Sequence, residues 1–408
     1  MTTRPLRLLA DANIPFLHRA FDRYGAVEVR PGSEILPGTL AETDILLVRS
    51  VTRVDAGLIA GTPVRFVGTA TAGTDHIDTG WLASQGIAFA SAPGSNAQSV
   101  VEYVLAALLM MHRGSSLVGT LSGKTVGVIG CGQVGGRLME RLPHLGCHVL
   151  ACDPPLAQAA EASREPHDFV PLDRVLDEAD IVTLHTPLTR TGPHPTYHLI
   201  GERELERLAG RNVLLVNAAR GAVVDNRALL DALECETLGG AVLDVWENEP
   251  TPDPDLVRLV DIGTPHIAGY AYDGKVAGTA MLEQALDAWL RAQSGEVARV
   301  SEGVPAKWDA EEALVPSEPL RINATEHATD DDAWLGALVL QAYDLRADDA
   351  RFRNLLDLPT AEHAARFREL RKTYPQRRHF DRFTVVGKVP EHLRDAVTKG
   401  LGFKIAQR

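Results

Sequence analysis

The sequence has few cysteines and no long apolar run, and each of these absences excludes a class of protein. Only four cysteines occur in 408 residues, and none shows the spacing of a metal site. A disulfide scaffold or a metal centre is therefore not expected, and the reducing cytoplasm is the expected location. The longest apolar run, Val100–Met111, contains Glu102 and is shorter than the ~20 residues that a membrane span needs, so it predicts a buried helix. No apolar segment follows the first arginines, so no signal peptide is expected.

Positive charge is also in deficit. The chain has 41 lysines and arginines against 54 aspartates and glutamates, which gives a formal net charge of −13. Nucleic acids and anionic membranes would repel such a protein, so neither is an expected partner. An anionic substrate would need a local positive site. The length predicts two or three domains, and the hydrophobic content of 45% suffices for a full core.

The stretch Thr125–Gly136 carries the most information in the chain. Its β-branched apolar residues predict a buried parallel strand, the glycines at Gly130, Gly132 and Gly135 follow, and helical spacing of apolar residues comes next. Strand, G-x-G-x-x-G turn and helix in this order are the context of a dinucleotide-binding fingerprint. The first glycine allows the tight turn, the second admits a pyrophosphate, and the third lets helix and strand pack closely.

Asp153 lies at the end of the next predicted strand, 18 residues after Gly135. This is near the ~20 residues expected for the carboxylate that binds the adenosine ribose. A carboxylate accepts hydrogen bonds from both ribose hydroxyls and repels a 2′-phosphate. The fingerprint therefore predicts NAD as the cofactor in preference to NADP.

Short strands alternate with helical patterns over most of the chain, which predicts doubly wound parallel sheets. Strands are expected at 6–10, 27–30, 45–48, 65–68 and 88–90, and again at 126–129, 149–152, 181–184, 213–217, 241–244 and 260–263.

Two long helices, 96–112 and 276–294, are expected to cross between the two sheet domains. The predicted division is a discontinuous substrate domain (1–95 and 267–295), an NAD-binding domain (96–266) and a C-terminal α+β domain (296–408) that begins with a linker containing Pro305 and Pro316. In the last domain we expect helices at 331–345, 361–374 and 390–401.

Three polar groups follow strands of the second sheet and should open onto the same crevice as the glycine turn. They contain Arg220, Glu249 and His266. Together they suit hydride transfer from a hydroxyl-bearing carbon: a histidine has the right unperturbed pKa for a base, a glutamate can orient its ring, and a guanidinium can bind a carboxylate bidentately. His185 also ends a strand and is a weaker candidate for the base. His194 and His198 suggest a metal pair, but Pro195 between them argues against one helix presenting both.

With these motifs in place, residues 1–295 resemble the D-2-hydroxyacid dehydrogenases. The resemblance is carried by the fingerprint with Asp153 and by the motifs Asn-Ala-Ala-Arg-Gly, Trp-Glu-Asn-Glu-Pro and Pro-His-Ile-Ala-Gly. In that family the arginine binds the substrate carboxylate, the glutamate supports the histidine, and the histidine is the acid/base. The resemblance assigns these roles to Arg220, Glu249 and His266.

A closer resemblance is to one branch of the family, which oxidises a small phosphorylated 2-hydroxy acid with NAD and forms homodimers through an added C-terminal domain. It implies that the substrate contacts Ser50, Thr71 and Tyr270. It also implies that NAD is lined by Gln133, Val134, Asp153, Thr186, Ala218, Ala219, Arg220, Asp244 and Gly269, in addition to the fingerprint glycines.

The sequence does not choose among the basic residues that would bind the substrate phosphate, which are Arg49, Arg53, Lys275 and Arg346. Two alternatives also stay open. One is a dehydrogenase of 3-phosphoglycerate or another D-2-hydroxy acid. The other is an NAD-sensing regulatory protein, although an intact arginine, glutamate and histidine set argues against it.

Overall fold

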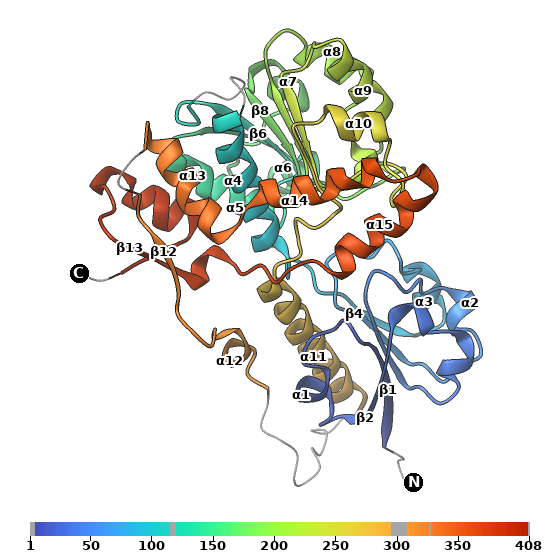
Figure 1. The fold of residues 1–408 in the computed structure, drawn as a ribbon. Helices are drawn as coiled ribbons and strands as arrows, with labels where there is room; N and C mark the ends of the chain where they lie inside the picture. Colours follow the sequence, from blue (N-terminus) through green and yellow to red (C-terminus); the bar gives the residue numbers. More distant parts are fainter. Residues whose placement is uncertain (1–4, 115–119, 295–307, 326–327, 407–408) are drawn as a thin grey trace. The chain divides into compact units, whose positions relative to one another are not determined.

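The computed structural model describes residues 5–114, 120–294, 308–325 and 328–406 (Figure 1). Contacts divide the chain into two compact units, the first formed by residues 1–96 with 271–317 and the second by residues 97–270 with 318–408. The part of the predicted linker that contains Pro305 lies outside the described residues, and the part with Pro316 includes a short helix, Ala310–Leu314. No helix of the described residues combines the length and apolar character that crossing a bilayer requires.

The first unit contains a five-stranded parallel sheet in the order β2-β1-β3-β4-β5. Its central strands β3 and β4 are buried at every residue, as expected for strands covered on both faces. The strands are β1 (Leu6–Asp11), β2 (Gly25–Arg30), β3 (Ile45–Val48), β4 (Phe66–Thr69) and β5 (Ala88–Ala90).

Two helices of the first unit begin at an aspartate whose side chain accepts hydrogen bonds from unpaired backbone N–H groups. Asp55 and Asp78 accept hydrogen bonds from N–H groups in the first turns of α2 and α3. The long helix α11 buries Val276, Leu282 and Leu286 in the core of this unit. The helices are α1 (Leu17–Phe21), α2 (Ala56–Ile59), α3 (Thr79–Ser84), α11 (Tyr272–Ser294) and α12 (Ala310–Leu314).

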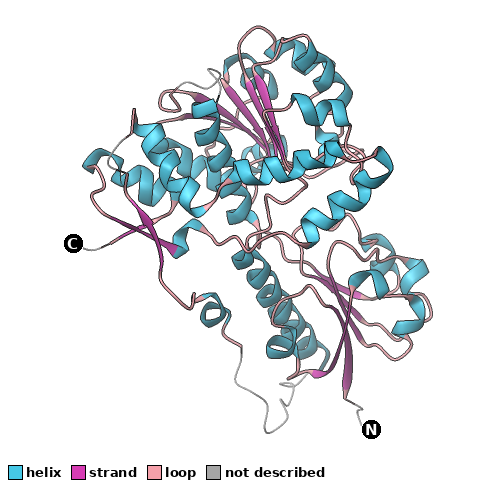
Figure 2. Cartoon of the chain, in the orientation of Figure 1, coloured by secondary structure: helices cyan, strands magenta, loops and turns pink. Residues whose placement is uncertain are grey.

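The second unit contains a six-stranded parallel sheet in the order β11-β10-β9-β8-β6-β7, with helices on both faces (Figure 2). The strand order reverses between β6 and β8, which is the point at which such sheets bind ligands. The strands are β6 (Thr125–Ile129), β7 (His148–Cys152), β8 (Ile181–Leu184), β9 (Leu214–Asn217), β10 (Gly240–Leu243) and β11 (Ile262–Gly263). The predicted doubly wound parallel architecture is confirmed in both units.

The helices of this sheet alternate with its strands, and three of them begin at an aspartate. Asp153, Asp225 and Asp253 each accept a hydrogen bond from the first turn that follows. The helices are α4 (Ala97–Gly114), α5 (Gly135–Arg141), α6 (Pro154–Ser163), α7 (Leu172–Glu178), α8 (Glu202–Leu208), α9 (Asn226–Glu234) and α10 (Pro254–Leu259).

The C-terminal residues form a small parallel sheet, β12-β13-β14, with three helices. The strands are β12 (Leu320–Asn323), β13 (Phe383–Val386) and β14 (Lys404–Ile405), and the helices are α13 (Asp331–Ala342), α14 (Leu345–Arg353) and α15 (Thr360–Lys372).

Two helix predictions in this segment were wrong in detail. The helix expected over 331–345 ends at Ala342, because Tyr343 is extended and the Asp344 side chain accepts from Arg346 N–H to start α14. The helix expected over 390–401 is a short 3₁₀ turn (Glu391–Leu393) followed by a wider π-type turn (Ala396–Leu401).

The C-terminal segment shares a core with residues 97–270, which differs from the separate domain expected from the sequence. Helix α13 packs against α4, and Trp334, Leu335 and Leu338 join the same buried cluster as the residues of α4. Polar contacts add to this packing, since Asp332 accepts from Leu121 N–H at 2.5 Å. The apolar residues of α4 are buried on nearly every side of the helix. The one helix therefore packs against both the rest of residues 97–270 and the C-terminal segment.

Candidate functional site

The glycine turn lies at the reversal point of the second sheet, between the carboxyl ends of β6 and β8. Gly130 has φ +88°, and a Cβ there would lie 2.7 Å from the carbonyl carbon of His185. Only glycine therefore allows the β6 turn to approach the residues that follow β8. The order strand, glycine turn, helix is the one that the fingerprint predicted.

The residues around this turn fit a dinucleotide. A Cβ at Gly132 would meet no atom within 4 Å, so the backbone there is open to a ligand. The Thr186 hydroxyl is buried and has no hydrogen-bond partner among the described residues. A buried polar atom without a partner costs free energy, and a bound ligand relieves that cost.

Asp153 is held at the mouth of the turn. Its Oδ2 accepts from Cys131 N–H at 2.8 Å, and its Oδ1 accepts from Leu156 N–H at 3.0 Å. Each oxygen keeps further acceptor capacity, so the half-buried carboxylate remains competent to accept from ribose hydroxyls. Gln133 and Val134, which were also predicted to line NAD, lie in the same turn just before α5.

Arg220 follows β9 in a backbone segment that its neighbours fix. The buried Asn217 side chain accepts from Ala219 N–H at 3.1 Å and donates to the Arg220 carbonyl at 3.0 Å. The Arg220 Nη1 donates to the Ala219 carbonyl at 2.8 Å. A Cβ at Gly221 would collide with the Trp246 backbone, so glycine is needed where the ends of β9 and β10 meet.

Asp244, predicted to line NAD, is fully buried after β10 and organises the loop that carries His266. Its carboxylate accepts from Ile267 N–H at 2.7 Å, from Ala268 N–H at 2.9 Å and from the Thr264 hydroxyl at 2.7 Å. Burial raises the pKa of Asp244, against the opposing influence of His266 and these hydrogen bonds. Tyr103 of α4, also fully buried, is hydrogen-bonded to the Thr264 hydroxyl at 2.8 Å and extends the network.

His266 and Glu249 form the pair that the sequence predicted. The His266 Nδ1 lies 2.8 Å from Glu249 Oε2, and the other oxygen of Glu249 accepts from Trp246 N–H at 3.0 Å. Burial acts to raise the pKa of Glu249, but His266 and the Trp246 N–H outweigh it, so this pKa lies below its ordinary value. His266 has φ +58°, a left-handed conformation that non-glycine residues rarely adopt and that the surrounding network maintains.

The rival base, His185, lies in a different environment. Its Nε2 is 2.9 Å from the Thr183 hydroxyl, and burial lowers the pKa of its ring to about 3. The ring is therefore neutral near pH 7. Among the described residues, no carboxylate is hydrogen-bonded to the His185 ring as Glu249 is to His266.

Ser50 and Thr71 belong to the first unit, in the loops that follow β3 and β4. Ser50 is exposed. The Thr71 hydroxyl lies 2.7 Å from that of Thr69 and donates to the Gly73 carbonyl at 2.8 Å. Tyr270, the third predicted substrate contact, lies in the second unit just after Gly269 on the His266 loop.

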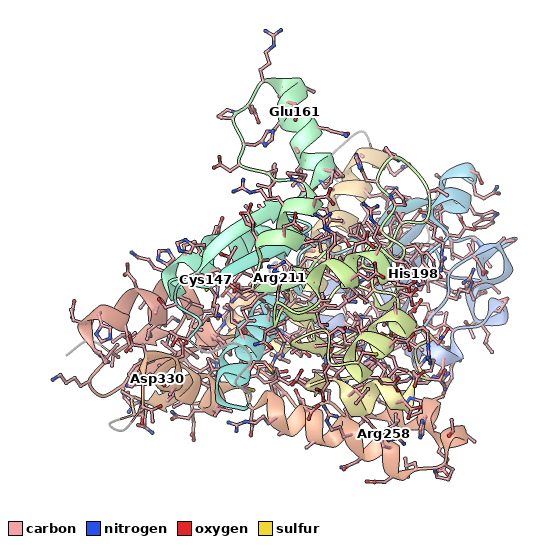
Figure 3. All side chains as sticks on the ribbon, turned by 90° about the horizontal axis from the view of Figure 1, so that it is seen from above. Cys147, Glu161, His198, Arg211, Arg258 and Asp330 are labelled. Carbon is pink, nitrogen blue, oxygen red and sulfur yellow. The ribbon has the colours of Figure 1, made fainter. Side chains whose placement is uncertain are left out.

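Of the two histidines that were considered from the sequence as a metal pair, His198 lies in a charged cluster. His198, labelled in Figure 3, has its Nε2 2.8 Å from Glu247 and its Nδ1 3.3 Å from Asp225. Both carboxylates also accept from backbone N–H groups at the start of α9. These bonds explain the cluster as a structural network around a helix terminus.

One residue beside the site was missed by sequence reasoning. Arg371 of α15 has its guanidinium 5.4 Å from the ring centroid of Tyr270. It lies 105 positions after His266 in a segment with no recognised motif, so no local pattern could have indicated it.

Comparison with known proteins agrees with this geometry. Residues 105–268 match the model of the D-isomer specific 2-hydroxyacid dehydrogenase NAD-binding domain, and residues 314–400 match a domain of unknown function. A solved protein from Thermus thermophilus, TT0316, is 26% identical with a TM-score of 0.57, covering 72% of this chain and 99% of its own. The D-lactate dehydrogenase of Aquifex aeolicus is 23% identical with a TM-score of 0.57, covering 70% and 96%, and shares the fold.

Fold and site thus define a dehydrogenase of the 2-hydroxyacid class with a nicotinamide dinucleotide fingerprint. The erythronate-4-phosphate dehydrogenase of Salinibacter ruber is 49% identical over 403 residues, 98% of this chain and 99% of that protein, and that of Pseudomonas aeruginosa is 48% identical over 383 residues, 91% and 93% of the two chains. The chain belongs to the erythronate-4-phosphate dehydrogenase family. The resemblance stated from the sequence motifs is confirmed, as is NAD binding.

Proposed function

We propose that the protein oxidises 4-phospho-D-erythronate to (R)-3-hydroxy-2-oxo-4-phosphooxybutanoate with NAD, an early oxidation in pyridoxal 5′-phosphate biosynthesis. Relatives that align with 91–98% of the chain carry the name of this activity. The single structural observation that supports it best is the 2.8 Å contact between His266 and Glu249.

The proposed mechanism assigns one task to each side chain. NAD, when bound, accepts the hydride from C2 of the substrate. His266 takes the proton of the C2 hydroxyl, since its Nδ1 is engaged by Glu249 and its Nε2 is the ring nitrogen left to face the substrate. Glu249 fixes the tautomer and stabilises the imidazolium as it forms. Its lowered pKa keeps it ionised for this purpose.

Arg220 is proposed to bind the substrate carboxylate and to polarise the adjacent C2–oxygen bond. Its carbonyl accepts from the Asn217 side chain and its Nη1 donates to the Ala219 carbonyl, so the guanidinium starts from a defined position. Such preorganisation lowers the entropy cost of orienting the substrate. Ser50, Thr71 and Tyr270 are proposed to contact the rest of the substrate.

A substrate panel tests the assignment. NADH formation is measured with 4-phospho-D-erythronate, 3-phosphoglycerate, D-lactate and D-glycerate at equal concentrations. We expect the highest kcat/KM with 4-phospho-D-erythronate. A preference for 3-phosphoglycerate would assign the protein to serine synthesis instead, and tight NAD binding without turnover of any acid would favour a regulatory role.

We further propose that the protein is a homodimer of the cytoplasm and that residues 296–408 supply the dimer interface. The resemblance to the phosphorylated-substrate branch supports the dimer. The four cysteines support a reducing compartment, because all are free thiols in the structure. Sedimentation velocity measures the oligomeric state, and a monomer at micromolar concentration would contradict the proposal.

A further inference from the structure

The phosphate of the proposed substrate needs a cationic partner, and the four candidates named from the sequence are already engaged or exposed. Lys275 of α11 is half-buried and already has an interaction partner. Arg53 pairs with Asp55 at 2.8 Å, and Arg49 donates to the Asn13 carbonyl at 3.3 Å. Arg346 is exposed on α14. None of these four both lies in the same unit as the His266 loop and is at least half-buried there.

Arg371 has this combination of features. It is half-buried on α15, its guanidinium lies 5.4 Å from the ring centroid of Tyr270, and both residues belong to the second unit. Its Nε is buried without a hydrogen-bond partner, and no carboxylate of the described residues pairs with it within 4.0 Å. An arginine has five N–H donors, so a half-buried guanidinium whose buried Nε has no partner favours an anion.

The surroundings hold Arg371 in place. Tyr270 packs edge-on against Tyr374, with ring centroids 6.0 Å apart. The Tyr374 hydroxyl donates to Asp348 at 2.7 Å, which anchors the aromatic pair to α14. The guanidinium therefore lies over a ring that does not swing freely, and the cation–π contact fixes its plane.

The position of Arg371 relative to the His266–Glu249 pair also favours it as the phosphate-binding cation. Tyr270 is four residues after His266 on the same loop, and the positive charge of Arg371 contributes to holding the pKa of Glu249 low. Arg371 is thus electrostatically coupled to the His266–Glu249 pair without a bond to it. The phosphate of the substrate is attached two carbons away from the carbon that reacts, so it lies beyond the reach of His266. A separate cation is therefore required to bind it.

We propose that Arg371, with Tyr270 beneath it, binds the terminal phosphate of the substrate and so determines specificity for phosphorylated 2-hydroxy acids. The inference rests on the proposed function, because it presupposes a phosphorylated substrate. It assigns the C-terminal segment a direct part in substrate recognition. Arginine suits this task because its planar fork matches phosphate oxygens.

The test compares a phosphorylated substrate with its unphosphorylated analogue. In Arg371→Ala we expect kcat/KM for 4-phospho-D-erythronate to fall roughly 10- to 100-fold, mainly through KM, as for a lost charge-assisted hydrogen bond. The kcat/KM for D-erythronate should change less than about threefold, because that substrate has no phosphate. Arg371→Lys should recover part of the loss. Arg368→Ala, on the exposed side of the same helix, is the matched control and should match the wild type.

Two further measurements make the result decisive. Inorganic phosphate should inhibit the wild type competitively and raise its melting temperature, and Arg371→Ala should lose both effects. Arg371→Gln keeps the length of the side chain, so it serves if the alanine variant melts below the assay temperature. Equal losses with both substrates, or an equal shift of both pH–rate profiles, would overturn the proposal and assign Arg371 to the support of Glu249 and His266.

Failure of the proposed function looks different. It would appear as absence of wild-type turnover of 4-phospho-D-erythronate. Phosphate-dependent stabilisation of the wild type and its loss in Arg371→Ala would still report on the anion site in that case. No phosphate effect in the wild type would overturn the site itself.

Discussion

His185 and His266 lie at the same carboxyl edge of one parallel sheet, yet the structure gives them different chemistry. His185 follows β8, is hydrogen-bonded to the neutral Thr183 hydroxyl, and has its pKa lowered to about 3 by burial. His266 is on the loop after β11 and is paired with Glu249, a carboxylate whose pKa is held low. Both histidines lie at the crevice because each follows a strand. Among the described residues, only His266 of the two has a charged partner, which stabilises the ring when it receives a proton.

The largest expected effect comes from removing the imidazole of His266. His266→Gln should lower kcat by about 10²- to 10⁴-fold, the range for loss of general acid–base catalysis. NAD binding, measured by fluorescence titration, should remain because the glycine turn is untouched. The same substitution at His185 is the control. Loss of turnover in His185→Gln with turnover retained in His266→Gln would contradict the assignment of His266 as the base.

The second-largest expected effect comes from changing Glu249, the partner of His266. Glu249→Gln keeps the shape of the side chain and removes its charge, so the imidazolium loses a charge-assisted hydrogen bond worth about 1.5–3 kcal/mol. That corresponds to a fall in kcat of roughly 10- to 150-fold. Because the pKa of Glu249 lies below its ordinary value, the carboxylate is ionised from pH 5 to 9. The loss should therefore appear throughout that range in steady-state assays, and an unchanged kcat would show that the pair is only structural.

A smaller effect extends the comparison to the cofactor side of the sheet. Asp153→Ala should reduce kcat/KM for NAD by about tenfold and raise the ratio of NADP to NAD use, since the repulsion of a 2′-phosphate is removed. Asp153 also caps α6, so a variant that loses only a cap is needed beside it. Asp253→Ala, at the start of α10, serves this purpose. A fixed cofactor preference would mean that Asp153 does not contact the ribose.

The smallest effect concerns stability and pH. The folded-state pKa of His185 lies below the ordinary value of 6.5, so the neutral ring stabilises the fold fully above pH 6.5, and this contribution is lost as the pH falls toward about 3. Between pH 7 and pH 5.5 the free energy of unfolding should fall by roughly 1 kcal/mol more in the wild type than in His185→Gln. Urea denaturation at both pH values measures it. Identical pH dependence would show that the ring is not buried in solution.

The parts of the fold that local patterns specify were predictable. Buried parallel strands carry β-branched apolar runs, and the glycine turn with Asp153 has fixed spacing, so the two sheets and the cofactor end of the site followed from the sequence. The position of Glu249 beside His266 was also predictable, since both follow adjacent strands of the sheet.

Other features depend on contacts between distant segments, which a linear pattern does not record. The break between α13 and α14 arises where Asp344 caps a new helix, although the apolar spacing runs on. The network beneath the His266 loop joins Asp244 to Tyr103, which belongs to a helix more than 140 residues earlier in the chain. Arg371 is brought to Tyr270 only by the docking of the C-terminal segment.

The helix α4 has a consequence for any attempt to shorten this protein. Its face toward α13 is buried by residues from the far end of the chain, among them Trp334 and Leu338. A truncated gene product that ended after α11 would therefore present a bare apolar stripe on its nucleotide-binding half and would be prone to aggregate. The C-terminal segment is part of the same folded unit as residues 97–270, so this protein is to be engineered at full length.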